Sequence, residues 1–191
     1  IRQAERHLRK NVARHPQSWN PRAENFVQTL ERLKAYYGEG APAVLWAHNT
    51  HIGDARHTPM RRAGMITVGQ QARERFGEDA VYLLGFASER GTFRAGRHWG
   101  ATGEVMQFRN SNPISINHWL NRGAPSDTAW IPLQAARDNP RLRLNAGHRA
   151  AGVTFDPSQP DFANYVPSNI PMRYDGLIFI RETTALDGLV E

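Results

Sequence analysis

The chain has 191 residues, 40% of them hydrophobic, and 24 Lys and Arg against 18 Asp and Glu give a formal net charge of +6. This length fits one domain, residues 1–191, with room for a core. The absence of cysteine excludes disulfides, thiolate metal ligands and a cysteine nucleophile. No apolar run is long enough to span a bilayer, so we expect no membrane partner. The arginines are scattered without a basic block, which argues against a nucleic-acid partner.

Two helices are predicted at the start of the chain. Apolar residues four apart predict a helix over 1–14, which His15-Pro16 ends because the residue before proline avoids the α region. A second helix is predicted from Asn20, a good N-cap, with Pro21 in the first helical position. Because the chain opens on Ile1, inside the first pattern, we expect it to begin partway through a longer protein.

Residues 43–54 change abruptly from apolar to polar. The run 43–47 predicts a buried strand of a parallel sheet, with Trp46 in the core. His48 and His51 follow, and ligands of open α/β sheets bind just beyond the carboxyl ends of such strands. The two histidines therefore indicate a functional site; the alternative is that they cap the strand and bond nearby carbonyl groups.

The next strand is predicted at 81–86, and the loop over 88–92 places Glu89 on the same edge as His48. Further strands are predicted at 105–108, 129–133 and 176–180, a short helix at 115–120, and a turn-rich loop at 147–152. Strands that alternate with helices predict an α/β fold with a mainly parallel sheet flanked by helices.

Two chemistries fit the histidine loop. In the first, a histidine handles the proton of a water that attacks a carbonyl, a task that suits its near-neutral pKa. In the second, a metal is bound by residues three apart along the loop: His48, His51, Asp54 and His57. No phosphate-binding loop, dinucleotide fingerprint or serine elbow is present.

Several segments together are similar to one known family. Residues 46–52 (WAHNTHI) resemble the signature of the erythromycin esterase family. Residues 18–26, 81–91, 147–152, 164–167 and 173–179 resemble its other segments in the same order. The resemblance implies an α/β fold of which this chain is the carboxyl-terminal portion, with the amino-terminal half missing.

The resemblance also implies an activity. Characterised members hydrolyse the lactone ester of macrolide antibiotics with an activated water. His48 and His51 map to paired histidines of the active-site cleft, and Arg22 maps to an arginine at the start of a helix, where it would stabilise an oxyanion. Substrate contacts are expected from Asn49, Glu89 and Trp99.

No metal or other cofactor is expected on this interpretation. The expected partners are a small-molecule ester or macrolide and the upstream half of the same protein, in the cytoplasm. The chain would be a carboxylic ester hydrolase when full length and could be inactive as 191 residues. Two alternatives stay open: a non-catalytic module that binds a sugar or polyketide through Trp99 and Tyr165, and a metal-dependent hydrolase.

Overall fold

The computed structural model describes residues 16–38, 40–139 and 145–187, so the helix predicted over 1–14 lies outside the described residues. The chain folds as two compact units, an amino-terminal unit (Ile1–Leu83) and a carboxyl-terminal unit (Leu84–Glu191). Within the described ranges, none of the helices combines the length and the apolar character that crossing a membrane requires.

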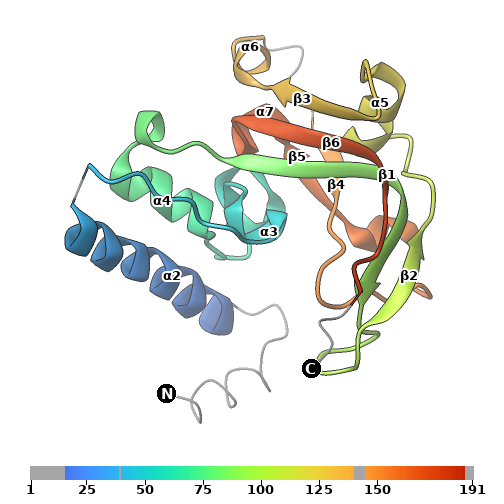
Figure 1. Ribbon diagram of the computed structural model, residues 1–191, viewed down its shortest axis with the longest axis horizontal. Coiled ribbons are helices and arrows are strands. Elements are labelled where there is room, and N and C mark those ends of the chain that lie inside the picture. Colours follow the sequence, from blue (N-terminus) through green and yellow to red (C-terminus); the bar gives the residue numbers. More distant parts are fainter. Residues whose placement is uncertain (1–15, 39, 140–144, 188–191) are drawn as a thin grey trace. The chain divides into compact units, whose positions relative to one another are not determined.

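The amino-terminal unit is helical (Figure 1). Its long helices are α2 (Pro16–Tyr37) and α4 (Val68–Phe76), and the short α3 (Asn49–Ile52) precedes three 3₁₀ turns, η1 (Ala55–His57), η2 (Pro59–Arg61) and η3 (Glu78–Ala80). The small core between α2 and α4 consists of buried residues Ala23, Val27 and Val68, with Leu45, Ile66 and Phe76 packed against it. Thr67 caps α4 by accepting a hydrogen bond from the amide of Gln70.

Helix α2 begins earlier than the sequence predicted. Its first residue is Pro16, and Pro21 lies inside the helix, where it cannot donate the usual backbone hydrogen bond. The prediction that Asn20 caps the helix is wrong because its side chain is used elsewhere. The amide Nδ2 donates to the carbonyl of Gly64 (2.9 Å), and Oδ1 accepts from the backbone N–H of Ile66 (3.0 Å).

The strand predicted at 43–47 is not formed. The segment is extended, but it pairs with none of the described strands. Val44 is 92% exposed and Trp46 is 83% exposed, so Trp46 does not lie in the core. A β-favouring run forms a strand only where a neighbouring strand pairs with it, and none of the described strands does so here.

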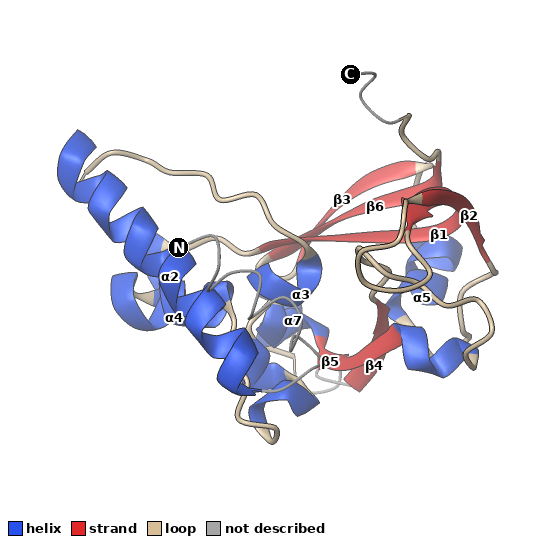
Figure 2. Cartoon of the chain, turned by 90° about the horizontal axis from the view of Figure 1, so that it is seen from below, coloured by secondary structure: helices blue, strands red, loops and turns tan. Residues whose placement is uncertain are grey.

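The carboxyl-terminal unit is built on a four-stranded sheet in the order β2-β1-β6-β3 (Figure 2). These strands are β1 (Leu84–Ala95), β2 (Glu104–Phe108), β3 (Thr128–Pro132) and β6 (Gly176–Thr183). Strands β1 and β6 are parallel, whereas β2 is antiparallel to β1 and β3 is antiparallel to β6. The predicted mixed α/β fold with helices flanking a sheet is confirmed, but a mainly parallel sheet is not.

Shorter elements complete this unit: α5 (Ile116–Gly123), α6 (Gln134–Arg137), β4 (Asn145–Arg149), η5 (Asp161–Asn164), β5 (Tyr165–Asn169) and α7 (Ile170–Arg173). Strands β4 and β5 form a separate antiparallel pair. The first residues of the predicted turn-rich loop at 147–152 therefore lie in a strand.

Strand β1 is longer than predicted and contains the expected loop at 88–92. Side chains of a strand alternate between its two faces, and Gly85, Ala87 and Glu89 share the buried face. Glu89 is thus an inward-facing residue in the middle of a strand rather than part of a loop beyond its end.

Candidate active site

The histidines of the candidate site lie on a very short helix. His48 is the N-cap of α3, and its ring nitrogen Nδ1 accepts a hydrogen bond from the backbone N–H of Thr50 (3.2 Å). The hydroxyl of Thr50 lies 2.8 Å from the same nitrogen. Because Nδ1 acts as the acceptor, a neutral His48 carries its proton on Nε2, which makes that atom a hydrogen-bond donor.

His51 lies one turn further along and is half-buried. Its ring stacks on the indole of Trp19 with centroids 4.5 Å apart and planes 6° from parallel. Within the described chain, neither ring nitrogen of His51 forms a hydrogen bond or an ion pair. Both nitrogens are therefore available to a water molecule or a substrate.

Arg22 comes from the early part of α2 and acts on the same histidine. Burial first, and then the positive charges of Arg22 and His48, lower the pKa of His51 to about 4. His51 is thus a neutral imidazole at neutral pH. Arg22 is half-buried and has no carboxylate partner among the described residues, so none of them neutralises its charge by an ion pair.

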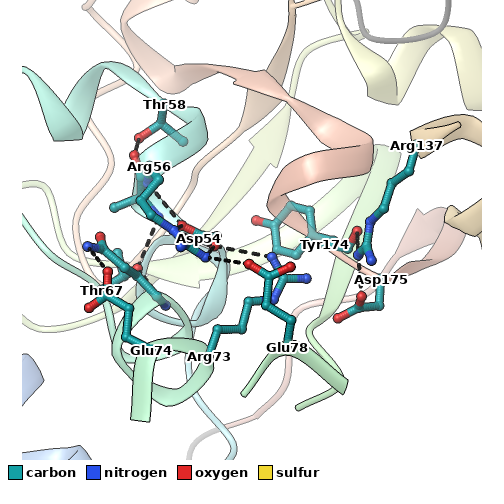
Figure 3. Close-up of polar contacts among 12 residues, drawn as sticks. Asp54, Arg56, Thr58, Thr67, Arg73, Glu74, Glu78, Arg137, Tyr174 and Asp175 are labelled. Atoms are coloured by element: carbon teal, nitrogen blue, oxygen red, sulfur yellow. Dashed lines mark hydrogen bonds and ion pairs between the residues drawn. The ribbon is translucent and has the colours of Figure 1, made fainter. Parts of the chain in front are cut away.

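The loop after α3 is fixed by a buried carboxylate. Asp54 is fully buried and binds Arg56 at 2.6 Å and Arg73 of α4 at 3.2 Å, as Figure 3 shows. Burial alone would raise the pKa of Asp54, but hydrogen bonds from Arg56 and its charge outweigh burial and keep that pKa below its usual value. The arrangement makes Asp54 a structural anchor for the turn that follows the histidines.

Helix α4 packs directly against α3. A Cβ added to Gly69 would lie 1.8 Å from the carbonyl oxygen of Ile52, the last residue of α3. The hydroxyl of Thr67 also accepts a hydrogen bond from the amide of Ala55 (3.1 Å). Close backbone approach and a shared cap therefore hold the histidine helix against α4.

Asn49, one of the expected substrate contacts, is half-buried in the first position of α3. It thus lies between the two histidines along the chain. The structure brings His48, His51 and Arg22 together in the amino-terminal unit and places Asn49 on the same short helix.

Glu89 and Trp99 belong to the carboxyl-terminal unit. Glu89 is 4% exposed, and its carboxylate accepts hydrogen bonds from the hydroxyl and the backbone N–H of Ser111. Trp99 is 48% exposed and lies in the connection between β1 and β2. The structure therefore presents Trp99 to solvent and encloses Glu89.

A pocket in the carboxyl-terminal unit adjoins the other predicted binding aromatic. Tyr165 is half-buried, and its hydroxyl accepts hydrogen bonds from Arg149 (3.0 Å) and from the amide of Asn112 (3.0 Å). The guanidinium of Arg149 also lies over the ring of Phe108, 4.7 Å from its centroid. Phe108, Arg149 and Phe155 line the pocket. Tyr165 thus anchors one of its walls.

The four residues of the alternative metal site do not lie together in one group of ligands. Among the described residues, no three His, Asp or Glu side chains come together in a group that could hold a metal ion. Asp54, the carboxylate of the predicted set, already binds two arginines. The spacing of three residues along the loop therefore does not bring these side chains to one metal-binding position.

Trp19 is the site residue that sequence reasoning missed. It lies three residues before Arg22 in α2, and the sequence offers no spacing that would pair it with His51, 32 positions later. A tryptophan at the start of an amphipathic helix is as typical of a core residue as of a site residue, so only the structure shows the stacking.

The fold is that of a mixed α/β protein, and its amino-terminal unit brings two histidines and an arginine together. The chain belongs to the erythromycin esterase family, whose model matches residues 1–183. The resemblance noted in the sequence is therefore confirmed over nearly the whole chain.

Three solved structures are similar to it. A protein from Bacillus cereus aligns with a TM-score of 0.57 and 18% identity over 73% of this chain and 33% of its own. A succinoglycan biosynthesis protein aligns with a TM-score of 0.55 and 16% identity over 73% of this chain and 32% of its own. A mutant of the erythromycin esterase EreC in its open conformation aligns with a TM-score of 0.56 and 14% identity over 85% of this chain and 36% of its own. These likenesses concern the fold, and the chain spans about a third of the length of each structure.

Proposed function

We propose that the site on α2 and α3 takes part in hydrolysing an ester or a macrolide lactone by attack of a histidine-assisted water. The observation that carries this proposal is the pairing of Arg22, a half-buried cation for which the described residues supply no carboxylate partner, with the neutral ring of His51. A tetrahedral intermediate of ester hydrolysis carries an oxyanion, and fixed donors and cations stabilise it.

The two histidines have different tasks in this proposal. His48 donates from Nε2 to the ester carbonyl and polarises it. A group with a pKa of about 4 is a weak base at neutral pH. His51 therefore orients the attacking water through a hydrogen bond and does not accept the proton of that water. Arg22 stabilises the negative charge that develops on the carbonyl oxygen.

The test measures turnover of macrolide lactones and simple aryl esters by the polypeptide as its host produces it. We expect His48→Ala to lower kcat/KM by more than about tenfold and Arg22→Gln by ~10²-fold, the usual scale for an oxyanion donor. Arg32→Gln is the matched control, because Arg32 is an exposed arginine of the same helix, and it should leave turnover unchanged.

Unchanged turnover of every hydrolysed ester by His48→Ala would overturn the proposal. Saturable binding of a sugar or polyketide without any product would also overturn it and would favour the binding-module alternative. Calorimetry with the same panel of ligands separates those two outcomes.

A further inference from the structure

The stack between Trp19 and His51 is the most regular contact in the candidate site. The two rings are 4.5 Å apart at their centroids and 6° from parallel. The ring nitrogens of an imidazole lie in its plane, so a face-to-face stack leaves their lone pair and N–H directions pointing sideways. The stack thus buries one face of the ring without consuming either nitrogen.

Trp19 is itself held in place. Its indole N–H donates to the carbonyl of Ile66 over 2.6 Å, and Asn20 makes two further hydrogen bonds to the backbone of Gly64 and Ile66. Two consecutive residues of α2 are therefore tied to a segment more than forty positions away along the chain. The indole is a fixed platform rather than a loose surface ring.

The helix that carries His51 cannot supply this rigidity alone. Helix α3 has only four residues, and a single turn is too short to be stable by its own hydrogen bonds. The orientation of the His51 ring therefore depends on what the ring contacts.

We propose that Trp19 is the positioning residue for His51, and that its indole face fixes the plane in which both ring nitrogens meet water or substrate. The proposal rests on the role proposed above for His51. Among the described residues, the titratable groups that act electrostatically on His51 are Arg22 of α2 and His48 at the start of α3, and both affect its protonation rather than its orientation. A displacement of about 1 Å in such a group can cost ~10²-fold in rate.

The test compares three variants by NMR and by kinetics. Trp19→Leu removes the aromatic face, Trp19→Phe keeps a face but loses the N–H bond to Ile66, and Asn20→Ala loosens the same anchor without touching the ring. Trp119→Leu is the matched control. The Trp119 indole also donates to a backbone carbonyl, that of Pro113 (3.0 Å), but none of the described histidines stacks on it.

The first measurement is the proton chemical shifts of the His51 ring, which the indole ring current moves upfield. We expect Trp19→Leu to abolish this upfield shift, Trp19→Phe to keep most of it, Asn20→Ala to reduce it only in part, and Trp119→Leu to keep all of it. Shifts that change equally in Trp19→Leu and Asn20→Ala would overturn the proposal, since they would make Trp19 a mere anchor for α2. This result does not depend on catalysis, so it separates failure of the stacking from failure of the proposed function.

The second measurement is turnover in the polypeptide as its host produces it. We expect Trp19→Leu to lower kcat at least about tenfold with little change in KM, and Trp19→Phe to restore most of kcat. A loss in Trp19→Leu that appears only in KM, or a loss that Trp19→Phe does not restore, would overturn the positioning role.

Discussion

Asp54 offers the sharpest test of how the histidine loop is held. Its carboxylate is fully buried and accepts hydrogen bonds from Arg56 at 2.6, 3.0 and 3.1 Å and from Arg73 at 3.2 Å. Asp54→Asn keeps the shape but removes the negative charge that faces the guanidinium of Arg73, which is 4% exposed. Breaking a buried ion pair from one side costs roughly 3–5 kcal/mol. Arg56 is 31% exposed, so solvent screens part of the interaction, and we expect about 3 kcal/mol, the low end of that range.

Glu78 provides the control within the same cluster. It binds the same Arg56 at 3.1 Å but is 65% exposed, so Glu78→Gln should cost less than about 1 kcal/mol. Urea unfolding followed by circular dichroism gives the free energy of unfolding of both variants. Hydrogen exchange of peptides from α4 shows whether the lost stability is local to that helix. Equal costs for the two variants would refute the reasoning that burial, rather than the presence of an ion pair, determines the value of this contact.

Three further predictions concern the same unit. Because the pKa of Asp54 is lowered in the folded chain, the stability that its carboxylate contributes is complete above the ordinary pKa of 3.8 and is lost as the pH falls through the lower folded pKa. In a urea-unfolding series over acidic pH, the free energy of unfolding should therefore fall less for Asp54→Asn than for the unmodified chain. Thr67→Ala removes the cap of α4 and an acceptor for the Ala55 amide, and urea unfolding should show a loss of roughly 1–2 kcal/mol. Gly69→Ala forces the carbonyl of Ile52 to move, so unfolding should show a loss of roughly 1–3 kcal/mol, together with altered NMR shifts of the His51 ring.

The sequence predicted the sheet better than it predicted the helical unit. Strands at 105–108, 129–133 and 176–180 were expected close to their observed bounds, and the short helix expected at 115–120 is observed as α5, Ile116–Gly123. In these segments the local pattern and the tertiary partner agree. The error at 88–92 has a local cause, because Ser, Glu, Arg, Gly and Thr are typical of loops, whereas pairing with β6 and β2 holds them in a strand.

The candidate site was predictable only in part. His48, His51 and Arg22 were named from the sequence, and the structure brings them together although the strand expected before them is not formed. Trp19 could not be found from sequence because stacking depends on the path between α2 and α3 rather than on spacing. Asp54 belonged to the alternative set of metal ligands, but in the structure its carboxylate binds two arginines. The spacing of residues along the sequence contains no information on such ion pairs.

The electrostatics of the described site bear on which step of hydrolysis it serves. Arg22 is a cation, His48 presents an N–H donor, and His51 stays neutral because burial, Arg22 and His48 oppose its protonation. Such a set stabilises negative charge on a carbonyl oxygen well and removes a proton from water poorly. The carboxylate that follows it in the chain, Asp54, is occupied by arginines. If the proposed hydrolysis is correct, the group that accepts the proton of water lies outside this set, and the contribution of α2 and α3 is to orient the water and to hold the oxyanion.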